Sequence, residues 1–244
     1  MIRTIEELSL NAWPALQTVL ADGWVQRFAG GYTRRANSVN PLYPAADDLE
    51  TKIARSERLY RDRGLPVVFK LTAASCPPEL DAFLAARGYA LDAQTSVQTL
   101  ALASFAPDRA PAVEITPTVT EAWFDAFCRA SNLAVQRRPI AWQMLNTIVP
   151  ATAFAAIQRE GEIVACGFAV AQAGYAGFYD IVTDLRYRRR GLGEQLMRSL
   201  LAWGQAQGAI TAYLQVMLNN PPALSLYAKL GFREVYQYWY RVGA

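Results

Sequence analysis

A short basic run with two glycines, Arg188-Arg189-Arg190-Gly191-Leu192-Gly193, does most to restrict what this chain can fold into. It lies between a strand-like segment, residues 178–183, and a helix-like segment, residues 192–207. Glycine lets the backbone come close to a ligand, and the first N–H groups and positive dipole end of a helix favour an anion. The run therefore predicts an anion-binding turn between a strand and a helix, although arginine-rich turns of this kind also occur as solvated surface.

A second cluster follows after one predicted helix and one predicted strand. It reads Asn220-Pro221-Pro222-Ala223-Leu224-Ser225-Leu226-Tyr227, and Gly231-Phe232 comes shortly after it. Together the two clusters closely resemble the GNAT superfamily of acyl-CoA-dependent N-acyltransferases over about residues 112–244. In that family an Arg/Gln-x-x-Gly-x-Gly/Ala loop binds the pyrophosphate of coenzyme A, and an Asn-x-x-Ala-x-x-Leu-Tyr-x-x-x-Gly-Phe element follows. The resemblance implies an α+β fold in which helices flank a mixed, mostly antiparallel sheet.

The predicted elements divide the chain into two parts. We expect a catalytic GNAT domain over residues 112–244 and a degenerate GNAT-like or cap domain over residues 1–105, with a linker at residues 103–111. The first part begins with apolar residues spaced as in a helix, from Ile5 to Leu20. Its ending, Arg87-Gly88-Tyr89, is a weak echo of Leu230-Gly231-Phe232, which favours a tandem arrangement. No Arg-x-x-Gly-x-Gly loop precedes the first ending, so we expect one coenzyme A site per chain.

Composition excludes several kinds of site and partner. The 244 residues include no histidine, which rules out Ser-His-Asp and Cys-His machinery and removes the usual ligands of catalytic zinc, so we expect no metal. The net charge of +3 is too small to indicate a nucleic acid partner. Three cysteines, an odd number, suit reduced thiols in the cytoplasm. The apolar run 163–179 is short for a membrane span and contains glycines, and the first 20 residues lack the core of a signal peptide, so we expect no membrane association.

The resemblance assigns coenzyme A to the basic turn and to the strand before it. Backbone N–H groups of residues 188–194 would hold the pyrophosphate, and the arginines would attract the 3′-phosphate. The pantetheine arm would pair with freed backbone of the strand, and Asn220 would contact it. An ordinary buried strand and a helix N-cap at Asn220 are the structural alternatives. The expected cofactor-binding residues are Ile181, Val182, Thr183, Arg188, Arg189, Arg190, Gly191, Leu192, Gly193, Glu194, Asn220 and Ala223.

Two residues are candidates for catalysis. In the resembled family a tyrosine at the position of Tyr227 acts as the general acid that protonates the leaving thiolate of coenzyme A. The alternative is a tyrosine that only packs against the sheet. The incoming amine must lose a proton, and Asp180 is the candidate base, ahead of Glu162 and Asp184. A chain of water molecules is the alternative to a carboxylate base.

The loop at residues 30–38 is a candidate site for the acceptor, because it is rich in hydrogen-bonding groups. An anionic acceptor such as an amino acid would suit an arginine that binds its carboxylate with two hydrogen bonds. We therefore expect Tyr32, Arg34 and Arg35 to bind the substrate. A surface loop with solvated arginines is the alternative.

These features predict an N-acetyltransferase that moves the acetyl group of acetyl-CoA to the amine of a small molecule or amino acid. A non-catalytic acyl-CoA sensor is the alternative reading of the same binding motifs. A nucleic-acid binder that uses Arg186–Arg190 is disfavoured, because the net charge is low and the sequence has no second patch of basic and aromatic residues. The sequence leaves the oligomeric state open.

Overall fold

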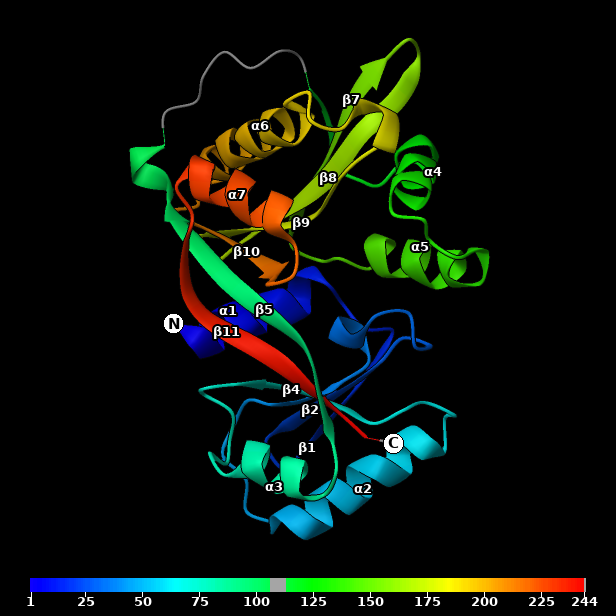
Figure 1. Ribbon diagram of the computed structural model, residues 1–244, viewed down its shortest axis with the longest axis vertical. Helices are drawn as coiled ribbons and strands as arrows, with labels where there is room; N and C mark the ends of the chain where they lie inside the picture. The colour runs from blue at the N-terminus through cyan, green and yellow to red at the C-terminus, as the bar shows by residue number, and fades with distance from the viewer. Residues whose placement is uncertain (106–112, 244) are drawn as a thin grey trace. The chain divides into compact units, whose positions relative to one another are not determined.

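The chain folds into two compact units. A computed structural model describes residues 1–105 and 113–243. Unit 1 contains Met1–Ser96 and Tyr236–Ala244, and unit 2 contains Val97–Val235 (Figure 1). Of the expected linker, residues 106–111 lie outside the described part of the chain. The compact units thus differ from the predicted domains, residues 1–105 and 112–244, because the end of the chain belongs with unit 1.

Unit 2 follows the order of elements that the sequence predicts. Strands β6 to β9 are antiparallel neighbours, and β10 pairs with β9 in parallel. The expected α+β fold, with a mixed and mostly antiparallel sheet, is confirmed. The elements are β6 (Glu114–Thr116), α4 (Glu121–Ala130), α5 (Arg138–Asn146), β7 (Ala151–Arg159), β8 (Glu162–Gln172), β9 (Tyr175–Thr183), α6 (Leu192–Ala206), β10 (Thr211–Met217), α7 (Pro221–Leu230) and the first residues of β11 (Arg233–Val242).

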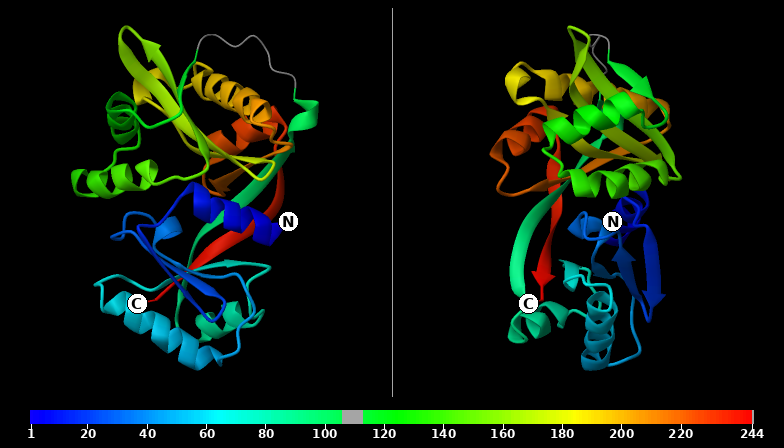
Figure 2. Two further views of the ribbon diagram at one scale, coloured as in Figure 1. Left: turned by 180° about the vertical axis from the view of Figure 1, so that it is seen from behind. Right: turned by 90° about the vertical axis from the view of Figure 1, so that its right-hand side faces the viewer.

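Helices cover both faces of the unit 2 sheet. Side chains alternate between the faces of a strand. Ala153 and Ala155 of β7 belong to the core that also contains α6, while the intervening Phe154 contacts Trp123 of α4 at 5.1 Å between ring centroids. Helices α4 and α6 therefore lie on opposite faces of this sheet, as Figure 2 shows. Within the described residues, no helix combines the length and the apolar character that crossing a membrane requires.

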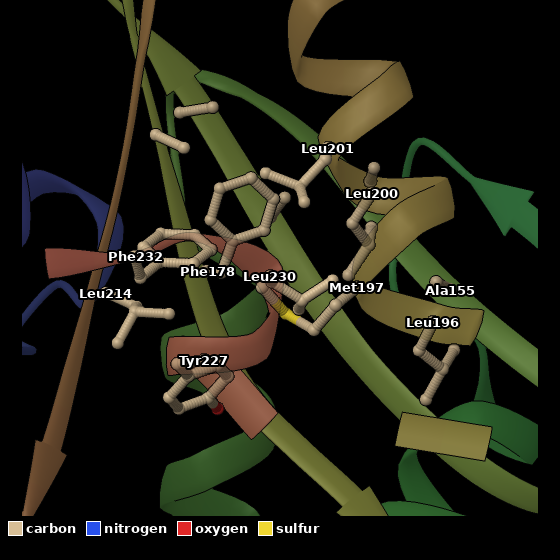
Figure 3. Packing of buried hydrophobic residues seen from close by; sticks show 14 of the residues in the cluster. Ala155, Phe178, Leu196, Met197, Leu200, Leu201, Leu214, Tyr227, Leu230 and Phe232 are labelled. Carbon is tan, nitrogen blue, oxygen red and sulfur yellow. The ribbon is translucent and has the colours of Figure 1, made fainter. Parts of the chain in front are cut away.

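The apolar stripe of α6 forms the larger core of unit 2. Leu196 and Leu200 have no exposed surface, as their spacing of one helical turn predicts. Gly204 lets the helix approach the sheet closely, because a Cβ atom there would lie 2.8 Å from the Cβ atom of Ala176. Figure 3 shows Leu201 of α6 and Leu230 of α7 near Phe178 of β9, in the same core cluster.

The strands of unit 1 lie side by side in the order β1-β2-β3-β4-β11. Strands β1, β2 and β3 are antiparallel, β3 and β4 are parallel, and β11 is antiparallel to β4. Its core contains Trp24, Phe69 and Leu71, which are at most 1% exposed. The elements are α1 (Ile2–Ala12), β1 (Gln17–Ala21), β2 (Trp24–Phe28), β3 (Val39–Pro41), α2 (Leu49–Arg61), β4 (Val68–Thr72), α3 (Leu80–Ala86) and the first part of β5 (Ala90–Ala101).

The helix predicted from the apolar spacing of Ile5 to Leu20 is wrong beyond residue 12. Helix α1 ends at Ala12, and residues 17–21 form the edge strand β1. Pro14 explains the difference, because proline disfavours helical backbone at the residue before it and has no N–H to continue the helix.

A buried ion pair joins α1 to the sheet of unit 1. Nζ of Lys70 lies 2.5 Å from Oε2 of Glu6, and both side chains are at most 3% exposed. The hydroxyl of Tyr236 donates to the other carboxylate oxygen at 2.7 Å, and the Tyr238 ring lies 4.1 Å from the ammonium group. Buried charges need such partners, because loss of water is expensive for each ion. Two of these partners come from β11, the last strand of the chain.

The two units repeat one order of elements. In unit 1 the strand β3 is followed by α2 and by the parallel strand β4, and then by α3 and β5. In unit 2 the strand β9 is followed by α6 and by the parallel strand β10, and then by α7 and β11. The echo between the two helix endings in the sequence thus belongs to a longer repeat of structure.

The last strand of each repeat pairs, at least in part, with a strand of the other repeat. Residues Tyr238–Val242 of β11 pair with Thr72–Val68 of β4 in unit 1. Strand β5 enters unit 2 at Val97 and is the neighbour of β10 there. Leu102, which follows β5 directly, is fully buried in the core of unit 2. Each unit is therefore completed by a segment from the other half of the sequence.

We expect the fragment 106–244 to lack a cooperative unfolding transition. Unit 2 would lose the strand beside β10 and the buried Leu102, and the end of β11 would lose its partner β4. Circular dichroism during heating measures the transition. The fragments 1–105 and 106–244 produced together should restore it, because each supplies the strand that the other unit needs. A cooperative transition of the fragment 106–244 alone, at the temperature of the whole chain, would contradict this account.

Candidate active site

The basic turn forms the start of helix α6. Gly191 is the N-cap, with a left-handed backbone at φ 78°, and a Cβ atom there would meet nothing within 4 Å. The first N–H groups of a helix have no partner within the helix. The structure thus combines a glycine in a conformation that other residues adopt at a cost, open space beside it, and a helix start. This is the geometry that the sequence predicts for an anion-binding turn.

Ion pairs outside the turn hold its approach in place. The guanidinium of Arg186 lies 3.1 Å from Oδ2 of Asp184 and 3.1 Å from Oε2 of Glu162 on the β7–β8 hairpin. The pKa of Arg186 is raised by these two carboxylates, and the pKa of Asp184 is lowered by the same arginine. Glu162 and Asp184 are the two further candidate bases from the sequence. In the structure both carboxylates pair with Arg186, just before the turn.

The three arginines of the motif are exposed and point to different partners. Nε of Arg188 donates to the carbonyl oxygen of Thr183 at 3.2 Å. The guanidinium of Arg190 lies 5.1 Å from the centroid of the Tyr187 ring. Arg189 has a left-handed backbone at φ 59°. The backbone of the turn is therefore better placed than its side chains to act as one binding surface.

Strands β9 and β10 stop pairing before either of them ends. Their parallel register runs from Tyr175 and Thr211 to Phe178 and Leu214. Strand β9 continues to Thr183, and β10 continues to Met217. Residues 181–183, which the sequence predicts to bind the acyl arm, thus lie beyond the part of β9 that pairs with β10.

A β-bulge occurs where β9 leaves β10. Phe168 of β8 pairs with Tyr179, but Cys166 pairs with Val182, so Gly167 faces two residues of β9. One of the two is Asp180, which has a positive φ of 49°. The alternation of side chains along a strand cannot predict on which face of the sheet Asp180 lies, because the bulge interrupts that alternation.

Tyr227 on α7 belongs to the core of unit 2 and is near enough to Asp180 in the bulge to be affected by its charge. Its side chain is 9% exposed, and its ring meets Phe232 edge to face at 6.0 Å. Burial, with a smaller effect of the charge on Asp180, raises the pKa of Tyr227 to about 12. Figure 3 shows its hydroxyl turned away from Phe232 and Leu230. In the described part of the chain, no group makes a hydrogen bond with this hydroxyl. The phenol is therefore protonated at neutral pH, and its proton is not used in a hydrogen bond to another described residue.

Asn220 caps the helix that carries Tyr227. Its side-chain oxygen accepts from the N–H of Ala223 at 3.4 Å, and Pro221 begins α7. At the other end Gly231 adopts the left-handed conformation, with φ 96°. Asn220 is thus a helix N-cap, which is one of its two predicted roles. The cap uses only the side-chain oxygen, so the N–H₂ group could still contact a ligand.

The predicted acceptor residues belong to unit 1. Tyr32 is 7% exposed and lies 6.3 Å from the Trp13 ring. Arg34 pairs with Asp92 at 2.5 Å, and the guanidinium of Arg35 lies 4.7 Å from the centroid of the Trp13 ring. The loop is thus held within unit 1 by its own contacts, and its role in binding the acceptor stays a prediction.

Known proteins match this chain over nearly its full length. The family model described as "Probable histone acetyltransferase Rv0428c C-terminal" matches residues 1–241. The chain is also 30% identical to a protein of Bacillus subtilis (strain 168) named "Uncharacterized N-acetyltransferase YobR", over 99% of this chain and 98% of that protein. The chain belongs to the GNAT family of N-acetyltransferases.

Solved GNAT structures share the fold of the whole chain. A GCN5-related N-acetyltransferase from Kribbella flavida has a TM-score of 0.72 at 17% identity, with 99% of this chain and 96% of that chain covered. A tandem GNAT protein from the clavulanic acid biosynthesis pathway has a TM-score of 0.65 at 16% identity, with 98% and 88% covered. The resemblance to the GNAT family seen in the two motifs is confirmed, and the chain is a GNAT-type acyltransferase.

Gly191→Glu should abolish binding of coenzyme A to this GNAT protein, because a carboxylate would occupy the open space at the helix start. Gly208→Glu is the matched control. Gly208 follows the other end of α6, has the same φ of 78° and also has nothing within 4 Å of a Cβ atom. Both variants suffer the same backbone strain, so calorimetry with coenzyme A separates the effects. Equal affinities in the two folded variants would remove the turn from the binding site.

Proposed function

We propose that unit 2 transfers the acetyl group of acetyl-CoA to the amine of a small molecule or amino acid. The observation that carries this proposal is the position of Tyr227, a buried and protonated phenol near the bulge at which β9 leaves β10. A GNAT-type acyltransferase needs a donor site, a place for the thioester and a proton for the leaving thiolate. The described residues of unit 2 offer a candidate for each.

The donor site combines the start of α6 with the end of β9, which pairs with β8 but no longer with β10. Backbone N–H groups of residues 188–194 bind the pyrophosphate, where the open space at Gly191 leaves room for it. The pantetheine arm lies along Ile181, Val182 and Thr183 and pairs with backbone that β10 does not use. The exposed arginines 188–190 attract the phosphates over a longer distance.

The reaction moves one acyl group and two protons. The amine nitrogen attacks the thioester carbon, a C–N bond forms, and the C–S bond breaks as the tetrahedral intermediate collapses. Tyr227 donates its proton to the departing sulfur, and solvent returns a proton to the phenolate. The proton lost by the amine passes to Asp180, which the bulge re-aims relative to its neighbours on the strand.

An amine panel with acetyl-CoA tests this proposal directly. Release of the free thiol of coenzyme A should rise above hydrolysis with at least one small amine or amino acid, and the product should carry one acetyl group by mass spectrometry. Calorimetry with coenzyme A on the same protein distinguishes the alternative. Tight binding of coenzyme A without turnover on any amine would support the acyl-CoA sensor instead.

Tyr227→Phe isolates the role of the hydroxyl. The ring that packs on Phe232 remains, so the fold should be preserved. We expect kcat to fall about 10²-fold, the usual scale for loss of a general acid, while the affinity for acetyl-CoA stays the same. The loss should shrink with an acyl donor whose thiol is more acidic, because that thiolate needs the proton less. Unchanged kcat would return Tyr227 to a packing role.

The pH dependence of kcat tests the raised pKa of Tyr227. A general acid works only while protonated, and burial moves the pKa of this phenol from 10.0 to about 12. We therefore expect no fall in kcat from its ionisation between about pH 8 and pH 10. The residual activity of Tyr227→Phe is the control and should have the same profile in this range. A fall centred near pH 10 that disappears in the variant would contradict the raised pKa.

A further inference from the structure

Glu194 places a negative charge inside the first turn of α6. Its side chain is 21% exposed and its carboxylate has two cationic partners, Arg198 with a side chain 29% exposed and Lys229 with a side chain 66% exposed. Nζ of Lys229 on α7 lies 2.5 Å from Oε2, and Nη2 of Arg198, one turn further along α6, lies 3.1 Å from Oε1. The pKa of Glu194 is lowered, mainly by the hydrogen bond from Lys229. The carboxylate is therefore ionised and held between two helices.

Such a charge has two opposite effects at this place. It stabilises the helix start, where the dipole is positive. It also repels the pyrophosphate that the same turn is proposed to bind, because both anions compete for one positive end. Lys229 and Arg198 reduce this repulsion by neutralising the carboxylate.

The two cations differ in what they connect. Arg198 and Glu194 lie on the same helix, four residues apart. Lys229 belongs to α7 and lies two residues after Tyr227. A second contact joins the helices at the same point, because a Cβ atom on Gly193 would lie 3.4 Å from Cδ2 of Leu226. Residues on both sides of Tyr227 thus contact consecutive residues of the anion-binding turn.

We propose that the Glu194–Lys229 ion pair is a positioning device, which fixes the helix of Tyr227 to the turn that binds the phosphates of the donor. This inference rests on the proposed function of unit 2. Neither side chain touches the reacting atoms. Lys229 acts on the donor by neutralising Glu194 and on the general acid by holding α7 against the turn.

Five variants separate the neutralisation of Glu194 from the link between α6 and α7. Lys229→Met removes both the neutralisation and the link. Arg198→Met removes a cation from the same carboxylate and keeps the link. Glu194→Gln removes the link and the repulsive charge together. Lys229→Arg restores the pair, and Glu194→Gln combined with Lys229→Met removes both charges of the Glu194–Lys229 pair and leaves Arg198 without the carboxylate.

The expected pattern differs between donor affinity and turnover. Calorimetry should show weaker binding of coenzyme A, by roughly two- to five-fold, in Lys229→Met and Arg198→Met alone, the scale of a partly exposed ion pair. Raising the salt concentration should reduce this difference. With saturating substrates, kcat should fall by roughly two- to five-fold in Lys229→Met, Glu194→Gln and the double variant, and stay unchanged in Arg198→Met and Lys229→Arg.

Three results would overturn the inference. Equal kcat in Lys229→Met and Arg198→Met would show that the link to α7 does not matter. Weak binding of coenzyme A that persists in the double variant would show a loss of structure and not of neutralisation. If Lys229→Met does not fold, a wild-type kcat in the isosteric Glu194→Gln would decide against the pair. Failure of the wild-type protein to bind coenzyme A would instead overturn the proposed function, and the inference with it.

Discussion

Gly167 and Ile181 lie so close across β8 and β9 that a Cβ atom at residue 167 would collide with Cδ1 of Ile181. This contact exists because two residues of β9 oppose one residue of β8. A bulge bends its strand and increases the local twist, and β9 pairs with β10 only as far as Phe178, just before it. The end of β9 that leaves β10, the turn after it and the start of α6 all follow this departure from regular pairing along the chain. A side chain at Gly167 would collide with Ile181 at the bulge itself.

Unit 1 has the same strand–helix–strand order but fills its helix start with its own carboxylates. The N–H groups of Ala46 and Asp47 donate to the two oxygens of Asp22, at 2.9 and 3.0 Å. Asp48 caps α2 through the N–H of Thr51. Lys52 pairs with Asp22 at 2.7 Å, as a cation would pair with a phosphate. In unit 1, N–H groups just before α2 and in its first turn are thus bonded to carboxylates of the chain itself.

The features that the sequence could predict are those set by residues close together in the chain. The turn at Gly191, the cap at Asn220 and the order of elements in unit 2 all depend on neighbours within a few residues, and the motifs record them. The rest depends on residues far apart. The bulge needs Gly167 opposite Ile181, and the support of the turn needs Glu162 beside Arg186, so no short pattern reveals either. The exchange of last strands is likewise a pairing between distant segments, which periodicity cannot indicate.

The place of β11 in unit 1 also has a consequence for synthesis on the ribosome. Proteins emerge with the N-terminus first, and early domains commonly fold before later ones are made. Unit 1 is complete only after β11 is made, because residues 238–242 pair with the edge of β4. Until then the Glu6–Lys70 pair also lacks the hydroxyl of Tyr236 and the ring of Tyr238. Residues 68–72 of β4 therefore have an open edge until residues 238–242 have been made, and an open strand edge can pair with other chains.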